Sequence, residues 1–192
     1  MSDTQNLKPS IEDLRKDLKR ENSKKEYQKV LRNTLLVVVF VAALAVLISS
    51  FFVTVLKVTG DSMTPTLETG QIVIAQNSSE FEVGDLLAFY YNNKVLVKRV
   101  IGSPGDWVNI DEDGKVSVNG VELVEDYASD FSLEPTDITF PYQVPENRWF
   151  VLGDHRSVSI DSRSSVVGCV TKEQLIGKVV FRVFPLGRFG GL

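Results

Sequence analysis

The longest apolar stretch of the chain covers residues 34–56, where Leu, Val, Ala and Phe dominate and Asp, Glu, Lys and Arg do not occur. A helix rises about 1.5 Å per residue, so a run of this length can cross a hydrocarbon core of roughly 30 Å. A cleavable signal peptide has an apolar stretch of roughly 7–15 residues near the N-terminus, and a buried core helix is also shorter. Here 33 residues come first, and the small-x-small triplet Ala43-Leu44-Ala45 lies inside the run. We therefore predict an uncleaved transmembrane anchor over residues 34–56.

The charges on the two sides of this anchor differ. Residues 1–33 carry nine Lys and Arg and six Asp and Glu, whereas Lys57 is followed by no other basic residue until Lys94. Because an excess of Lys and Arg marks the cytoplasmic side, we predict a single-pass protein of the cell membrane. Its cytoplasmic tail is residues 1–33 and its extracytoplasmic domain is residues 57–192. That domain holds 12 Lys and Arg against 19 Asp and Glu, which argues against a nucleic-acid surface.

Beyond the anchor, short runs of β-branched and aromatic residues alternate with turn residues. Residues 85–91 and 94–101 are two such runs separated by Asn92-Asn93, which predicts a β-hairpin. Residues 125–145 are irregular and contain three prolines, and we expect an inserted loop or lobe over 121–145. The outer domain is therefore predicted to be mostly β, with helix chiefly in the anchor. Further strands are expected over residues 107–110, 115–118, 121–123, 149–152 and 178–184.

The outer domain contains a possible histidine base for a serine nucleophile. A serine hydroxyl reacts poorly until a nearby base can take its proton, and the usual base is histidine. The single histidine, His155, follows Asp154, so a Ser–His–Asp site is formally possible. Adjacent residues on a strand point to opposite faces, however, which places Asp154 badly for orienting its neighbour.

Lysine is the alternative base, provided that burial lowers its pKa from about 10.4 towards neutrality. Strand alternation places Lys98 on the face that Leu96 and Val100 share, while Arg99 goes to the other face. An uncompensated charge on such an apolar face is costly. On this pattern alone two interpretations stay open, a catalytic lysine and an edge-strand or snorkelling lysine.

Three segments now carry a family resemblance, in this order behind the anchor. They are Ser-Met-x-Pro-Thr-Leu at 62–67, Lys-Arg-Val-x-Gly-x-Pro-Gly-Asp at 98–106, and Gly-Asp-x-Arg-x-x-Ser-x-Asp-Ser-Arg at 153–163. Together they resemble the signature boxes of the type I signal peptidases, and Val-Gly-Asp at 83–85 resembles a fourth, shorter one. The match runs from about residue 60 to 170. It implies the signal-peptidase β-rich catalytic domain and a serine endopeptidase that removes signal peptides from secretory precursors.

The resemblance implies a role for each matching residue. Ser62 would be the nucleophile, and Lys98 the general base that later donates a proton to the leaving amine. Ser159 would hold the lysine by a hydrogen bond, and Asp161 and Arg163 would form a supporting ion pair beneath it. Taken alone, that pair would be an ordinary surface ion pair worth about 0–1 kcal/mol.

The resemblance leaves two positions without an assigned role. Some relatives carry a serine hydroxyl donor two positions before the nucleophile, where this chain has Gly60, so a second oxyanion donor must come from elsewhere or be absent. His155 stands where asparagine is common in the family, and we expect it to cap a turn rather than to act as a base.

The expected substrate is a precursor cut after a small-x-small pattern. Ser62 lies six residues beyond residue 56, at most about 20–22 Å of extended chain, so it should lie near the outer surface of the lipid bilayer. A membrane-bound precursor would meet it there at raised effective concentration. The candidate substrate-binding residues are the apolar ones that flank the dyad, namely Met63, Leu67, Leu96 and Val97. With a single His and a single Cys (Cys169), no ordinary zinc site is possible and no metal or cofactor is expected.

Two rival functions remain for comparison. A self-cleaving, repressor-like Ser/Lys peptidase would have a DNA-binding segment where this chain has its anchor. A membrane-tethered β domain that binds exported chains without cutting them would have no chemical use for the set Ser62, Lys98 and Ser159.

Overall fold

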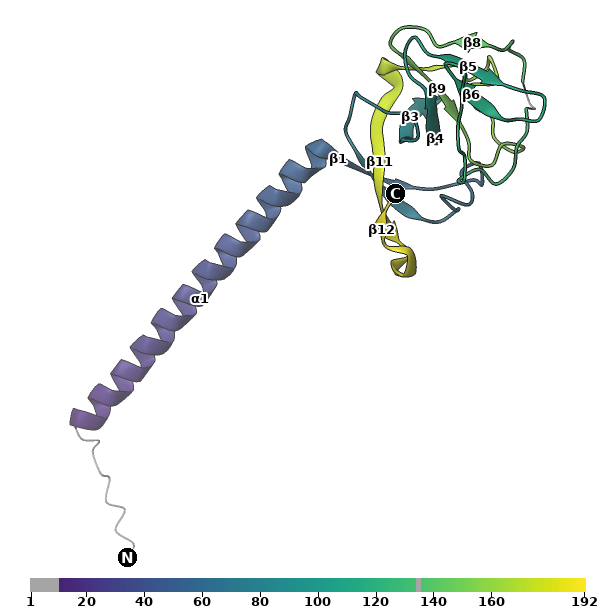
Figure 1. Cartoon of the computed structure of the whole chain (residues 1–192). Coiled ribbons are helices and arrows are strands. Elements are labelled where there is room, and N and C mark those ends of the chain that lie inside the picture. The colour runs from purple at the N-terminus through teal and green to yellow at the C-terminus, as the bar shows by residue number, and fades with distance from the viewer. Residues whose placement is uncertain (1–10, 134–135) are drawn as a thin grey trace, which may run out of the picture. The chain divides into compact units, whose positions relative to one another are not determined.

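The computed structural model describes residues 11–133 and 136–192. The chain divides into two units, one ending at Phe51 and the other formed by Phe52–Leu192. The first unit is built on the helix α1 (Ile11–Phe52), and the second consists mainly of strands (Figure 1). The prediction of a mostly β protein behind one long N-terminal helix is confirmed.

The helix α1 differs from the sequence prediction at both ends. Within the described residues it begins at Ile11, so much of the expected tail is helical and continuous with the apolar run. It ends at Phe52, whereas we expected helix up to Leu56. Val53–Lys57 form the strand β1 instead, because their backbone pairs with Ile72–Gln76 and the branched side chains of Val53 and Val55 favour extended backbone.

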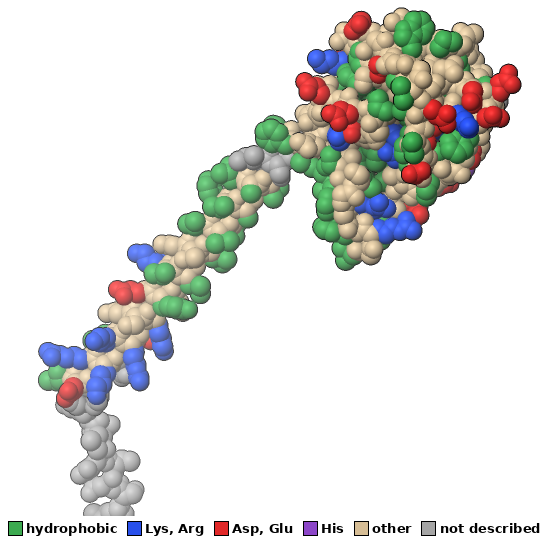
Figure 2. Space-filling view, in the orientation of Figure 1, with side chains coloured by type: hydrophobic (Ala, Val, Ile, Leu, Met, Phe, Trp, Pro, Cys, Tyr) green, Lys and Arg blue, Asp and Glu red, His purple; other side chains and the backbone are tan. Residues whose placement is uncertain are grey.

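The apolar part of α1 is exposed in the described chain. Leu14–Leu47 contains a stretch long and apolar enough to cross a membrane, and none of that stretch is buried. Figure 2 shows hydrophobic side chains covering α1 towards its C-terminal end and Lys and Arg gathered around its N-terminal part. A helix that is apolar on all sides and unburied fits a lipid environment rather than water.

The larger sheet is antiparallel throughout, and β4, the strand that carries Lys98, lies in its interior. The hairpin β3–β4 turns at Asn92 and Asn93, whose φ angles of 43° and 58° confirm the two-residue turn that the sequence predicted. Strands β1 and β2 were not expected. In spatial order the sheet contains β1 (Val53–Lys57), β2 (Ile72–Gln76), β11 (Leu175–Phe184), β3 (Leu86–Tyr91), β4 (Lys94–Gly102), β9 (Arg148–Leu152) and β10 (Val170–Thr171), with β12 (Gly190–Gly191) paired to β11.

A smaller antiparallel sheet covers the other end of the second unit. Its order is β7 (Val121–Glu122), β6 (Val116–Val118), β5 (Trp107–Ile110) and β8 (Tyr142–Gln143). Short 3-10 helices are found at η1 (Lys172–Gln174) and η2 (Leu186–Arg188).

Residues 121–145 are less independent than the expected inserted lobe. Their two ends, β7 and β8, complete the smaller sheet by pairing with β6 and β5. Between these strands, Leu123, Leu133 and Phe140 pack against the buried cluster that contains Phe150 and Ile101. The segment is therefore part of the same hydrophobic core as the motif-bearing strands.

The strand β4 takes part in all three apolar clusters of the second unit. Ile101 belongs to the cluster under the smaller sheet, Val100 to the one around Trp149, and Val97 packs against the one that contains Met63. Because protein interiors are close-packed, this position leaves β4 little freedom to shift. The side chains that β4 carries are therefore held at fixed positions.

Candidate active site

Ser62 lies in the turn that follows β1. Gly60 enters this turn with φ of +87°, a left-handed backbone that glycine adopts without strain. The Ser62 carbonyl oxygen accepts a hydrogen bond from the His155 backbone N–H (3.1 Å), which joins the first motif to the third. The Ser62 side chain is partly exposed, so its hydroxyl can reach a substrate from solvent.

Lys98 is buried on β4, with only 3% of its surface exposed. Its Nζ donates to Ser159 Oγ (2.8 Å). Burial lowers the pKa of Lys98 from 10.5 to about 8, partly opposed by the negative charge of Asp161. Since β4 lies between β3 and β9, the edge-strand and snorkelling interpretations of this lysine are wrong.

Asp161 and Arg163 form an ion pair (2.9 Å) whose two side chains are completely buried. The idea of an ordinary surface pair is therefore wrong. Asp161 also accepts the Gly153 backbone N–H (3.0 Å), and Arg163 donates to the carbonyl oxygen of Ser159 (3.2 Å). The pair thus fixes the backbone on both sides of the site, at Gly153 and at Ser159.

Gly153 is the point where the turn that carries Ser62 and the segment that carries Ser159 meet. A Cβ placed on Gly153 would lie 2.5 Å from the Ser62 carbonyl oxygen and would also collide with Ser159 Oγ. The structure therefore brings Ser62, Ser159 and Lys98 to one place. No hydrogen bond joins Ser62 Oγ to Lys98 Nζ in the described chain, and such bonds often tighten only when substrate is bound.

A second buried network, centred on Asp154, was not anticipated from the sequence beyond its place in a turn. Asp154 is fully buried and accepts from Arg99 Nε (2.8 Å), Arg99 Nη2 (2.6 Å) and Thr66 Oγ1 (2.5 Å). The Arg99 guanidinium also stacks 3.9 Å above the Tyr127 ring. One residue from each of the three motifs meets here. The available signal was that Thr66, Arg99 and Asp154 are each part of one of the three motifs.

A third network ties residues 125–130 to the segment that carries Ser159. Glu125 and Arg156 form an ion pair (2.6 Å) with 1% of each side chain exposed. Asp130 accepts the backbone N–H groups of Arg156 (2.8 Å) and Ser157 (2.9 Å). Residues 125–130 therefore hold the turn that leads to Ser159, a role that their lack of a motif concealed.

His155 contacts the turn that carries Ser62 by its side chain as well as its backbone. Its Nδ1 lies 3.0 Å from Thr64 Oγ1, and that hydroxyl donates to the Asp61 carbonyl oxygen (2.8 Å). Since a hydroxyl has one proton, Thr64 must accept its second bond from the Nδ1–H of His155. Asp154 is engaged by Arg99 and Thr66, so it does not orient His155. This arrangement disfavours a Ser–His–Asp triad. His155 instead links its own turn to the turn that carries Ser62.

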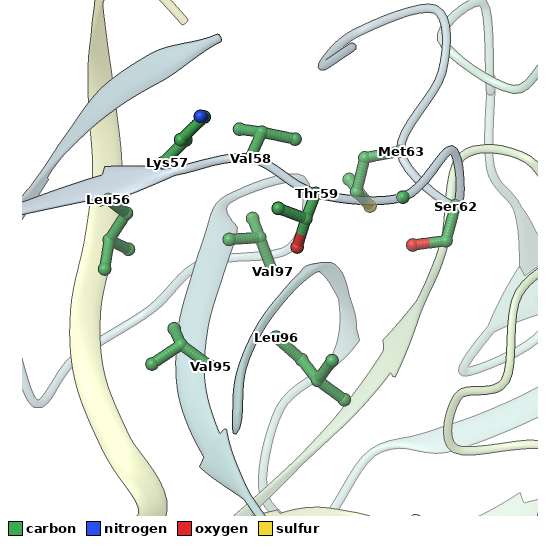
Figure 3. A pocket seen from close by; sticks show the side chains of 10 residues that line it. Leu56, Lys57, Val58, Thr59, Ser62, Met63, Val95, Leu96 and Val97 are labelled. Carbon is green, nitrogen blue, oxygen red and sulfur yellow. The ribbon is translucent and has the colours of Figure 1, made fainter. Parts of the chain in front are cut away.

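A small apolar pocket opens beside Ser62 (Figure 3). Three of the four expected substrate-binding residues, Met63, Leu96 and Val97, line it. Leu67 does not, because it is fully buried in the core cluster under Met63. The remaining lining residues are Leu56, Lys57, Val58, Thr59, Gly60, Ser62 and Val95.

The described residues offer neither a metal-binding cluster nor a reactive thiol. No group of three His, Cys, Asp or Glu side chains in that part of the chain is arranged to hold a metal ion. Cys169 is buried and unpaired, and burial raises the pKa of its thiol to about 11, so it stays protonated and unreactive at neutral pH.

Comparison with known proteins gives matches over most of the chain. The family described as "Signal peptidase, peptidase S26" matches residues 31–184. Signal peptidase I of Bacillus amyloliquefaciens is 32% identical over 179 residues, which cover 88% of this chain and 96% of that protein. Signal peptidase I S of Bacillus subtilis is 35% identical over 160 residues, covering 77% and 86%.

A solved structure is also similar. The crystal structure of a signal peptidase I from Enterococcus faecalis is 34% identical in sequence. The match covers 52% of this chain and 97% of that one, with a TM-score of 0.43.

Proposed function

This chain belongs to the signal peptidase family, peptidase S26, and is thus a serine endopeptidase that removes signal peptides, for which we propose Ser62 as the nucleophile and Lys98 as the general base. The observation that carries this proposal is the burial of Lys98 next to Ser159, which in turn lies against the backbone of Ser62. A buried amine without a counter-ion in contact is costly unless its neutral form has a use.

In the proposed reaction, neutral Lys98 takes the proton of Ser62 Oγ as that oxygen attacks the scissile carbonyl carbon. The tetrahedral intermediate then collapses, and the amine leaving group takes the proton from Lys98. Water, activated by the same lysine, hydrolyses the acyl-enzyme. A pKa of about 8 leaves roughly a tenth of Lys98 neutral at pH 7 and most of it neutral at pH 9.

Ser159, Asp161 and Arg163 are proposed as positioning residues. The Ser159 hydroxyl directs the Lys98 amine by its hydrogen bond (2.8 Å), and the buried Asp161–Arg163 pair holds the backbone that carries Ser159. The negative charge of Asp161 raises the pKa of Lys98 and the positive charge of Arg163 lowers it, so that burial remains the main influence on this amine. The pair therefore supports geometry more than charge.

The pocket beside Ser62 is proposed to receive the small side chains that precede the cleavage site. Its apolar walls come from Leu56, Val58, Met63, Leu96 and Val97, and the one charged residue of the described lining, Lys57, points its amine away from Leu96 and Val97. Leu56 and Met63 both belong to this lining, and the small apolar pocket suits a small apolar side chain. A preference for small side chains before the cleavage site is part of the small-x-small pattern that we propose for the substrate.

We further propose that the N-terminus is cytoplasmic, that the apolar part of α1 spans the cell membrane, and that the β domain lies outside it. The support is the excess of Lys and Arg before residue 34 and the unburied apolar surface of α1. The nucleophile follows the end of α1 by ten residues, so a membrane-bound precursor would present its cleavage site close to Ser62.

The test is cleavage of a purified secretory precursor by the detergent-solubilised full-length protein. Ser62→Ala and Lys98→Met should abolish release of a mature N-terminus after a small-x-small site. Exposed control variants, Ser79→Ala and Lys115→Met, should cut like the wild type. Cleavage by Lys98→Met would refute Lys98 as the base, and a wild type that cuts no precursor would favour the binding domain instead.

A further inference from the structure

The site as described contains one backbone donor for the oxyanion and no assigned second one. The Ser62 backbone N–H makes no hydrogen bond within the described chain, so it is free to donate to a substrate oxygen. Gly60 has no side chain, and a Cβ there would meet nothing within 4 Å, so nothing fills that position. The negative charge that develops on a carbonyl oxygen during attack is best stabilised by preorganised donors aimed at it.

Thr59 brings an uncommitted hydroxyl to this position. Its side chain is exposed and makes no hydrogen bond within the described chain, although Thr64, Thr66 and Thr69 in the same turn region all do. Thr59 and Ser62 line the same pocket. An unengaged hydroxyl on this wall can donate its proton to a bound ligand without breaking a bond in the protein.

The orientation of the lining side chains distinguishes Thr59 from the other polar candidate. Figure 3 shows Thr59 just after β1, with its hydroxyl on the side that faces Leu96 and Val97, and the Ser62 hydroxyl pointing towards the same space. The amine of Lys57 points to the opposite side of its strand, away from that space. Thr59 is therefore the side-chain donor that faces the position of a carbonyl attacked by Ser62.

We propose that Thr59 Oγ1 is the second oxyanion donor of this enzyme, acting with the Ser62 backbone N–H. The inference rests on the proposed role of Ser62. When Ser62 Oγ bonds to the carbonyl carbon and its proton passes to Lys98, the carbonyl π electrons move to oxygen, and Thr59 donates a hydrogen bond to that oxyanion. When the C–N bond breaks, the carbonyl reforms and the hydrogen bond weakens. No proton leaves Thr59 in the cycle.

The test compares Thr59→Val, which removes the hydroxyl and keeps the branched shape, with Thr59→Ser, which keeps the hydroxyl. Both are measured on precursor cleavage by the full-length protein. Because the donor acts on the transition state, we expect Thr59→Val to lower kcat by about 10²–10³ with KM nearly unchanged, and Thr59→Ser to keep kcat within about tenfold. A Thr59→Val enzyme with wild-type kcat, or with a raised KM alone, would overturn the proposal.

A second measurement uses binding instead of turnover. A peptide aldehyde ending in alanine forms a hemiacetal with Ser62, whose oxygen occupies the oxyanion position, whereas the matching peptide acid forms no such bond. Thr59→Val should weaken binding of the aldehyde by a factor close to its loss in kcat and leave binding of the acid unaffected. Equal weakening of both would assign Thr59 to ground-state binding and refute the proposal. Aldehyde binding undiminished in Ser62→Ala would instead refute Ser62 as the nucleophile, so the two failures are distinguishable.

Discussion

Lys98→Met isolates the electrostatic contribution of a buried amine to the stability of this protein. In the folded state, burial lowers the pKa of Lys98 from 10.5 to about 8, which corresponds to about 3 kcal/mol at roughly 1.4 kcal/mol per unit. Between these two pKa values the unfolded chain holds the proton and the folded protein has released it. The unfolded state then binds more protons, so the contribution of Lys98 to the free energy of unfolding rises with pH from about 8 to 10.5. Below pH 8 this contribution does not change with pH.

Methionine has a similar unbranched shape and no charge, so the variant lacks this pH dependence. It also leaves Ser159 without its buried partner, which adds a cost of about 1–3 kcal/mol that does not change with pH. The useful quantity is therefore the difference between the two free energies of unfolding as a function of pH. We expect the wild type to gain about 2 kcal/mol on the variant between pH 7 and pH 9.5.

The assay is urea denaturation of the detergent-solubilised full-length proteins, followed by tryptophan fluorescence. Both tryptophans, Trp107 and Trp149, lie in the β domain, so the signal reports on that domain. Tyr127 and Cys169, whose pKa values are raised by burial, are present in both proteins and cancel in the difference. Two curves that stay parallel from pH 7 to 9.5 would refute the argument, because they would mean that Lys98 has the same pKa folded and unfolded.

Three further predictions concern catalysis and the support of the site. In precursor cleavage, kcat/KM should rise with pH and level off above about 8 as Lys98 loses its proton, and a flat profile from pH 6 to 10 would exclude this base. Gly153→Ala should lower cleavage at least about 10²-fold in a folded protein, because its Cβ would push against the Ser62 carbonyl oxygen and Ser159; near-normal activity would show that the site tolerates this shift. Asp130→Ala should lower the free energy of unfolding by about 1–2 kcal/mol and reduce cleavage, because two backbone N–H groups before Ser159 lose their acceptor. Asp130→Asn keeps one acceptor oxygen, so its stability and cleavage rate should lie between those of the wild type and Asp130→Ala. A loss in Asp130→Asn equal to that in Asp130→Ala would contradict this role.

Several features followed from the sequence because they depend on local order along the chain. The length and composition of the apolar run predicted a long N-terminal helix, and Asn92-Asn93 between two β-branched runs predicted the β3–β4 hairpin. The resemblance to signal peptidases was carried by ordered motifs and is confirmed by the family match. Strand alternation also placed Lys98 among apolar neighbours, although it left open whether β4 lay at an edge.

Other features required the tertiary structure because they join residues that the sequence keeps far apart. The end of α1 at Phe52 is set by pairing of β1 with β2, and β2 itself carried no pattern strong enough to be expected. Leu67 looked like a pocket residue by its position after Ser62, but the turn directs it into the core.

The support of the site was hidden from the sequence for the same reason. The ion pair of Glu125 with Arg156 and the cap by Asp130 lie in a segment without a motif, and their partners are 26 to 31 residues away. The order of residues along the chain thus determined the long apolar helix and the β-rich class, and the family resemblance supplied the candidate dyad. Which buried charges meet, and which hydroxyl faces Ser62, was decided by the folding of distant segments onto one core, since burial and hydrogen-bond geometry exist only in three dimensions.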